Sequence, residues 1–229
     1  MTATPEFIPH QPHMPPGGSL ETAEAYRRVM AARRSVRQFS TRPVDFRLIE
    51  SIIAAAGASP SGANKQPWRF VVVGDADTKR KIRLAAEEEE RAFYERRAPN
   101  AWLEDLQPLR TGPEKPFLED APWLIAVFKL MKDDRADSPN DGVYFVNESV
   151  GMATGMLLAA AQHAGLATLT HTPSPMKFLT DLLGRPDYER PYVLIPVGWA
   201  ADDCEVPNIE RKPLDEIMTV YQPDDGDSG

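Results

Sequence analysis

The chain has 229 residues, 42% of them hydrophobic and 26% charged, so it fits one globular domain with a substantial buried core. Lys and Arg number 26 against 34 for Asp and Glu, and the resulting net charge of −8 argues against general nucleic-acid binding. The single cysteine, Cys204, excludes an intrachain disulfide and suits a reducing compartment, so we expect a cytoplasmic location.

The two ends of the chain differ in composition from its middle. We expect a flexible segment over residues 1–19 and a flexible tail over 223–229, on either side of one domain over 20–222. The start lacks the apolar core of a signal peptide. Residues 149–173 are weakly charged, but Gln162 and His163 interrupt them, which favours a buried helix over a membrane span.

Between the ends, helical and extended spacing alternate. Helices are predicted over residues 21–33, 46–56, 77–93 and 144–163, and strands over 69–73, 123–130, 166–170 and 192–197. Asp45 is the expected N-cap of the second helix, with Gly57 as its stop. Strands and helices mixed in this order indicate an α/β or α+β sandwich.

Two segments carry further expectations. The helix over 144–163 is apolar on nearly every side, so we expect a second copy of the chain to cover it. Residues 94–115 lack clear periodicity, and a long irregular stretch in a compact domain is usually functional or disordered. We expect a lid at about residues 91–117.

A basic group follows the first predicted helix. Arg33, Arg34 and Arg37, with the hydroxyl of Ser35, are the donors that bind phosphate oxygens. A solvated basic helix end is an equally good interpretation of this run. Arg211, near the other end of the chain, is either a second phosphate contact or a plain surface charge.

Small residues gather between the second helix and the first strand. Pro60, Ser61, Gly62 and Ala63 would let a backbone approach a planar ligand closely, with exposed amides for its polar edge. An ordinary turn would favour the same residue types.

Three residues could together hold an amino-acid zwitterion. Glu90 and Tyr94 are four apart on a predicted helix and so share a face, and Lys115 lies further along the expected lid. A carboxylate would bind the ammonium group, while a phenol and an ammonium would bind the carboxylate. The alternative is a solvated face, since residues 87–90 are simply four acids in a row.

Thr170 and Thr172 stand where a strand ends, and their hydroxyls could donate to a ligand or cap the next turn. The chain has no strand-linked G-x-G-x-x-G, no Walker loop and no G-x-S-x-G elbow. Its four histidines form no cluster with carboxylates or the cysteine, so neither metal nor covalent catalysis is expected.

In their order and spacing, these motifs resemble the nitroreductase superfamily. The resemblance rests on R-R-S-V-R-Q-F at 33–39 and A-S-P-S-G-A-N-K-Q-P-W at 58–68. Three further segments resemble the iodotyrosine deiodinase branch of this superfamily: K-I-R-L-A-A-E-E-E-E-R-A-F-Y at 81–94, A-P-W-L-I-A-V-F-K at 121–129 and R-K-P-L-D-E-I-M at 211–218. The likeness covers residues 20–220 approximately. Vertebrate members carry an amino-terminal membrane anchor that is not seen here, so the chain resembles a soluble, microbial-type member.

The resemblance implies a nitroreductase-like three-layer α+β sandwich with a central mixed sheet, in an intertwined homodimer with FMN at the interface. The implied FMN-binding residues are Arg33, Arg34, Ser35, Arg37, Pro60, Ser61, Gly62, Thr170, Thr172 and Arg211. Of these, Thr172 would lie nearest flavin N5 and act in catalysis. The implied substrate-binding residues are the Ala63 amide, Glu90, Tyr94 and Lys115.

The function that this implies is FMN-dependent reductive dehalogenation of halogenated tyrosine, with no metal, nucleic-acid or membrane partner. A general NAD(P)H nitroreductase or quinone reductase, a dehalogenase of another halophenol, and a non-enzymatic flavin-binding protein are the alternatives. His171, Gly112, Pro113 and Trp123 depart from the residues expected of the branch.

Overall fold

A four-stranded sheet forms the centre of the computed structural model, which describes residues 6–135, 138 and 140–221; the tail expected at 223–229 lies outside them. The strand order is β1-β2-β4-β3, and all neighbours pair antiparallel. An isolated parallel bridge joins Ser35 to Thr168. The strands are β1 (Trp68–Val73), β2 (Trp123–Leu130), β3 (Ala167–Thr168) and β4 (Glu189–Gly198).

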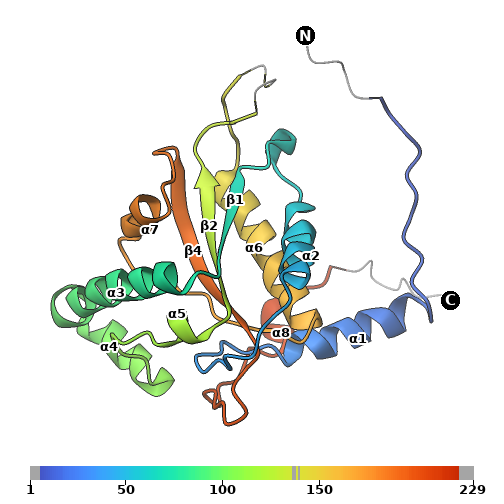
Figure 1. Ribbon diagram of the computed structural model, residues 1–229. Coiled ribbons are helices and arrows are strands. Elements are labelled where there is room, and N and C mark those ends of the chain that lie inside the picture. Colours follow the sequence, from blue (N-terminus) through green and yellow to red (C-terminus); the bar gives the residue numbers. More distant parts are fainter. Residues whose placement is uncertain (1–5, 136–137, 139, 222–229) are drawn as a thin grey trace.

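The alternation of side chains along β2 explains why helices cover both faces of the sheet. Leu124, Ala126 and Phe128 enter one apolar cluster, while Ile125 and Val127 enter the other. The first cluster is covered by α3 (Ala76–Ala92), α5 (Phe117–Asp120) and α7 (Lys177–Leu182), and the second by α2 (Phe46–Gly57) and α6 (Val146–His163) (Figure 1). The expected three-layer α+β sandwich is confirmed. The expected mixed sheet is wrong for the four named strands, which pair antiparallel, because the parallel contact of Ser35 with Thr168 is an isolated bridge and does not extend into a strand.

Most predicted elements are present, with shifted ends. The Asp45 side chain accepts a hydrogen bond of 2.9 Å from the Arg47 amide, which confirms the N-cap of α2. Gly57 is the last residue of that helix rather than its stop. Helix α6 begins at Val146, two residues later than predicted, because Phe145 has a left-handed backbone with φ of 47°.

The expectation of an irregular segment over 94–115 is wrong in its local structure. A π-helical turn, η2 (Phe93–Arg97), continues α3 and is followed by α4 (Asn100–Leu106) and the 3-10 turn η3 (Gln107–Leu109). Each piece is shorter than the window of about 11 residues over which apolar periodicity can be recognised. The movement of this segment as a lid stays a prediction.

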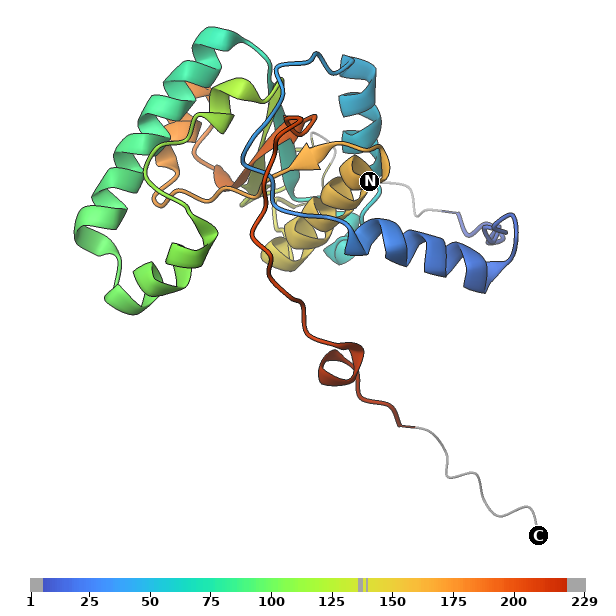
Figure 2. The same ribbon diagram turned by 90° about the horizontal axis from the view of Figure 1, so that it is seen from below.

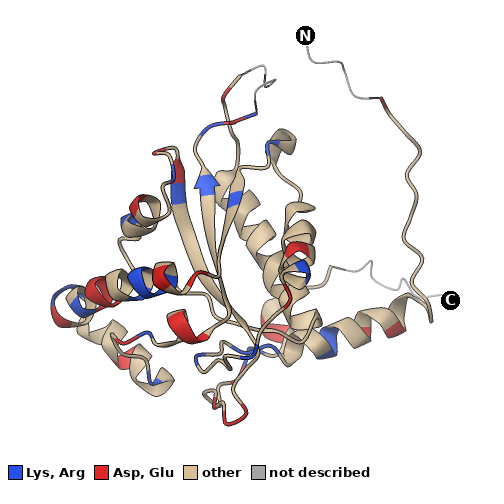
Figure 3. Ribbon diagram, viewed as in Figure 1, with Lys and Arg blue, Asp and Glu red and all other residues tan. Residues whose placement is uncertain are grey.

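Two parts of the chain extend from the body of the domain (Figure 2). Helix α1 (Ser19–Ala31) has no buried residue, and the C-terminal arm carries α8 (Leu214–Ile217), whose apolar side chains are exposed. Charges of both signs crowd α3, whereas α6 is largely uncharged (Figure 3). Within the described residues, no helix has both the length and the apolar content that crossing a membrane requires.

Candidate active site

A cavity of about 340 Å³ opens beside the C-terminal end of α3. Its walls come from α3, η2, α4, the residues before α5 and the extended segment 169–174. Phe93 and Trp102 contribute an edge-to-face ring pair with centroids 5.0 Å apart. Arg37 also lines the cavity. An aromatic surface beside charged groups suits a ligand with an aromatic ring and ionised substituents.

The three residues predicted to hold a zwitterion meet in this cavity. Glu90 lies in α3, Tyr94 in η2, and Lys115 just before α5. The Lys115 ammonium is 3.1 Å from Glu90 Oε2, lies 5.7 Å from the centre of the Tyr94 ring and donates to the Gly112 carbonyl. The Tyr94 hydroxyl is 2.9 Å from Thr111 Oγ1. A carboxylate, an ammonium and a phenol thus lie close together in the wall of the cavity.

The solvated-face interpretation of residues 87–90 does not fit this geometry. Glu87 is 5% exposed, accepts a hydrogen bond of 2.8 Å from the Lys115 amide and pairs with Arg83 at 3.1 Å. The Glu90 side chain is 14% exposed and the Lys115 side chain 6%. Glu87 therefore fixes the backbone of Lys115, while Glu90 faces its ammonium.

Thr170 and Thr172 line the same cavity, and the residue between them, His171, is buried. This alternation follows from extended backbone, which His171 adopts in a bridge to Leu194. The His171 amide donates to the Leu194 carbonyl at 2.9 Å. Thr170, His171 and Thr172 therefore all line the cavity from a segment that the sheet anchors, with both threonines exposed.

His171 is a site residue that the sequence marked only as a departure. Its ring packs edge-on against Phe117 at 5.6 Å, and its Nε2 has no hydrogen-bond partner among the described residues. Burial, with repulsion from Lys115 and Arg37, lowers the pKa of His171 to about 3. The imidazole is therefore neutral at physiological pH.

The basic group forms a second, adjoining cavity of about 170 Å³. Five of its lining residues were predicted as FMN contacts: Arg33, Arg34, Ser35, Arg37 and Arg211. Arg211 donates to the Arg33 carbonyl at 2.6 Å, which joins the C-terminal arm to the end of α1. Burial, and repulsion from Arg211 and Arg34, lower the pKa of Arg33. Arg34 also donates to the Pro207 carbonyl, and Arg211 to the Ala31 carbonyl at 2.9 Å. Among the described residues no ion pair engages these four guanidinium groups, so no carboxylate neutralises their charge.

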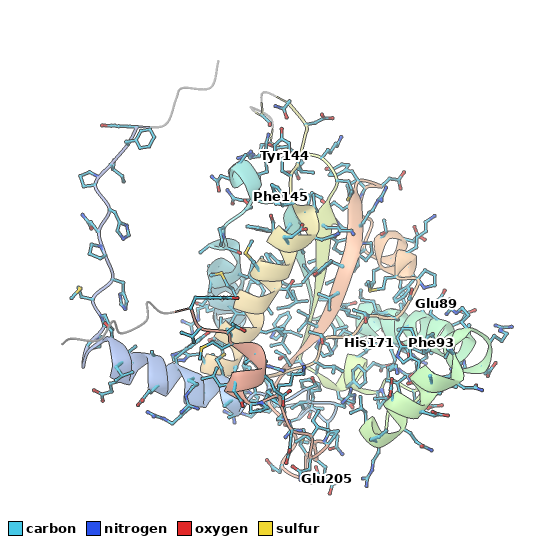
Figure 4. All side chains as sticks on the ribbon, turned by 180° about the vertical axis from the view of Figure 1, so that it is seen from behind. Glu89, Phe93, Tyr144, Phe145, His171 and Glu205 are labelled. Carbon is cyan, nitrogen blue, oxygen red and sulfur yellow. The ribbon has the colours of Figure 1, made fainter. Side chains whose placement is uncertain are left out.

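Residues 60–63 do not join the other predicted site residues within one chain. Their turn lies at the end of β2 where the Leu130 amide donates to the Pro67 carbonyl, whereas the Ser35–Thr168 bridge lies at the opposite end. β2 has eight residues, which corresponds to roughly 25 Å. Figure 4 marks the two ends with Phe145, which is beside Gly62, and Glu205, which lines a cavity with Ser35.

Sequence reasoning missed the ring pair of Phe93 and Trp102 and the buried carboxylate of Glu87. Both rings lie within the expected lid at about residues 91–117, and an aromatic side chain in such a segment is the signal that could have identified them. Nothing in a run of four acids distinguishes the buried member from its neighbours.

Comparison with known proteins adds independent findings. A family model described as the nitroreductase family matches residues 30–199. The chain is 49% identical over 222 residues to an iodotyrosine deiodinase of Haliscomenobacter hydrossis, covering 96% of this chain and all of that protein. It is 41% identical over 222 residues to human iodotyrosine deiodinase 1, covering 94% of this chain and 76% of that protein.

A crystal structure of oxidized iodotyrosine deiodinase bound to FMN and 3-iodo-L-tyrosine is similar in fold. Its TM-score is 0.75 at 30% sequence identity, over 86% of this chain and 99% of that chain. A BluB-like flavoprotein from Clostridium difficile, at 22% identity and a TM-score of 0.65, shares the fold.

Proposed function

This chain belongs to the nitroreductase family, and we propose that it is an FMN-dependent oxidoreductase that removes iodide from iodotyrosine and gives tyrosine. One observation carries the proposal: Glu90, Tyr94 and Lys115 line the cavity to which Thr170 and Thr172 contribute. A general nitroreductase needs no such arrangement for an amino-acid zwitterion. The relatives named as iodotyrosine deiodinases support the same activity.

The basic cavity fits the phosphate of FMN. Arg33, Arg34 and Arg211 place three positive charges around a space of about 170 Å³, with no carboxylate paired to them among the described residues. Ser35 adds a neutral donor. FMN, when bound and reduced, supplies the two electrons that, with one proton, replace a carbon–iodine bond by a carbon–hydrogen bond and release iodide. The Thr172 hydroxyl would donate to flavin N5, with Thr170 as the weaker candidate.

The chain's own residues would orient the substrate. Glu90 would bind the α-ammonium group, and Tyr94 with Lys115 the α-carboxylate, as charge-assisted hydrogen bonds. The exposed amide of Ala63 would donate to the phenolate oxygen. Residues 91–117 would act as a lid that encloses the ring and excludes water.

A homodimer would complete the site. The turn of Pro60, Ser61 and Gly62 is roughly 25 Å of strand away from the basic cavity in one chain, so a second copy would supply it to the flavin. Met152 and Met156 on α6 are 46% and 37% exposed, which leaves an apolar face for that copy to cover. The cytoplasmic location expected from the single cysteine stays a prediction.

Steady-state turnover tests the proposal. FMN-loaded protein is supplied with dithionite and 3-iodotyrosine, and tyrosine and iodide are quantified by chromatography. Equal amounts of tyrosine and iodide are expected. Turnover of NAD(P)H with nitroaromatics or quinones but not of iodotyrosine would support the general reductase. Release of iodide from simple iodophenols alone would support a dehalogenase of another halophenol, and binding without turnover a non-enzymatic role.

A further inference from the structure

The turn between α2 and β1 has an unusual backbone. Ala63, Asn64 and Gln66 have φ of 49°, 53° and 49°, and none of them is glycine. Side chains disfavour this left-handed region, so surrounding contacts must hold these residues in it. Such positions concentrate at binding sites, where surrounding contacts hold them in place.

The turn presents a free donor to its surroundings. Ala63 is exposed, and its amide donates no hydrogen bond within the described part of the chain. The flanking groups are bonded within the turn: Ser61 Oγ accepts from the Gln66 amide at 2.9 Å, and the Asn64 amide donates to the Ser61 carbonyl at 3.0 Å. The local bonds therefore leave the Ala63 amide without an acceptor in the described part of the chain.

Lys65 connects this exposed turn to a buried cluster of polar groups. It is only 8% exposed, and its ammonium donates to Asp133 Oδ2 at 2.8 Å, to Ser138 Oγ at 3.1 Å and to the Asn140 carbonyl at 3.3 Å. An ammonium has three donors, so these acceptors satisfy all of them. The anchor ties the turn to a segment that lies 68 residues away in the sequence.

Asp133 is the centre of the anchoring cluster. It is 7% exposed and accepts from Lys65, from Arg135 Nη2 at 2.7 Å and from Ser138 Oγ at 2.6 Å. Arg135 also donates to the Asn64 carbonyl at 3.4 Å, which gives the turn a second support. A buried ion pair adds little net stability relative to apolar side chains of similar size. A role in holding the backbone in one conformation suits such a pair better.

We propose that Lys65 and Asp133 are positioning residues for the phenolate end of the substrate. Their buried ion pair holds the left-handed turn so that the Ala63 amide is presented as a fixed donor. This inference rests on the proposed function, in which that amide binds the phenolate oxygen. A positioning role of this kind differs from a purely structural role because loss of the ion pair would weaken binding at the phenolate end of the ligand only.

Two ligands that differ at the phenol separate these roles. Dissociation constants for 3-iodotyrosine and for its O-methyl ether are measured by flavin absorbance on FMN-loaded protein whose unfolding midpoint is recorded. The ether keeps the ring and the zwitterion but cannot form a phenolate. Lys65→Met and Asp133→Asn are expected to weaken 3-iodotyrosine binding about tenfold and to leave the ether nearly unchanged.

A matched control is available between α3 and α5. Lys79 is also 8% exposed, and its ammonium donates to the carbonyls of Glu119 and Ala121, each at 2.8 Å. Lys79→Met removes an equally buried ammonium and is expected to leave the ratio of the two dissociation constants unchanged. Lys65→Arg keeps the cation and is expected to stay close to the wild-type ratio.

Three outcomes would overturn the inference in distinguishable ways. A wild-type ratio in both Lys65→Met and Asp133→Asn would reduce the ion pair to a structural support. An equal change in Lys79→Met would show that the ratio reports general loosening. Equal binding of the two ligands by the wild-type protein would remove the phenolate contact of Ala63 itself, and with it this part of the proposed function.

Discussion

Replacing Glu90 by Gln tests how the cavity recognises the amino-acid end of the substrate. The change keeps the size of the side chain and removes its charge. Glu90 Oε2 lies 3.1 Å from the Lys115 ammonium, and the two side chains are 14% and 6% exposed. A charge-assisted hydrogen bond in such a setting contributes about 1.5–3 kcal/mol, which corresponds to a rise in the dissociation constant of about tenfold to 150-fold.

The structure favours the lower half of that range. Glu90 is already paired with Lys115 in the ligand-free protein, so the substrate ammonium competes with an existing partner rather than meeting an unpaired carboxylate. We therefore expect 3-iodotyrosine binding to Glu90→Gln to weaken by about tenfold to 40-fold. FMN affinity should be unchanged, since no flavin contact is assigned to Glu90.

Titration of FMN-loaded protein with 3-iodotyrosine, followed by flavin absorbance, measures the effect. Glu89→Gln is the matched control, because Glu89 is the preceding residue of α3, pairs with Arg97 at 3.0 Å and does not line the cavity. 2-Iodophenol, which lacks the zwitterion, should bind both proteins equally. Unchanged 3-iodotyrosine affinity in Glu90→Gln, or equal weakening of both ligands, would refute the zwitterion assignment.

Three further predictions follow from the site. Thr172→Ala should slow dehalogenation at least tenfold and Thr170→Ala less, with nitroaromatic reduction retained as the control; equal effects would contradict the assignment of Thr172 to N5. The pKa of His171 is about 3 in the folded protein and about 6.5 in the unfolded protein. As the pH falls through about 6.5, the unfolded state therefore binds more protons than the folded state, and the free energy of unfolding decreases. Between pH 7 and pH 5 this effect should lower the free energy of unfolding of the wild-type protein by about 2 kcal/mol, and His171→Gln should lack that decrease when unfolding in urea is measured. Parallel pH profiles of the free energy of unfolding for the two proteins would contradict this. Arg34→Glu and Gly62→Asp should each abolish FMN binding, and refolding an equal mixture should restore about a quarter of the sites, because half of the dimers are mixed and each then holds one intact site; no restoration would contradict a shared site.

Elements with a clear local pattern were predictable. The run Trp123–Leu130 has side chains for two apolar clusters, and its bounds as β2 are those predicted. Asp45 before an apolar helix predicted the N-cap that its hydrogen bond to Arg47 confirms. The spacing of Glu90 and Tyr94 predicted a shared face, and the structure brings both to one cavity with Lys115.

Features that depend on contacts distant in sequence were not predictable. No local pattern distinguishes Lys65 from a surface lysine, because its ion-pair partner, Asp133, lies 68 residues later in the sequence. The short helices after α3 have no periodicity long enough to recognise, and their position depends on packing between Phe93 and Trp102. The burial of His171 follows from its bridge to Leu194, which no local pattern indicates.

An anaerobic titration tests the central claim most directly. The flavin of the purified, FMN-loaded protein is reduced and then titrated with 3-iodotyrosine, while flavin absorbance and released tyrosine are followed together. Reductive dehalogenation predicts that the flavin is reoxidised with one tyrosine released for each flavin, since each reaction consumes two electrons. Binding of 3-iodotyrosine without flavin reoxidation, in a protein that still reduces nitroaromatics, would contradict it.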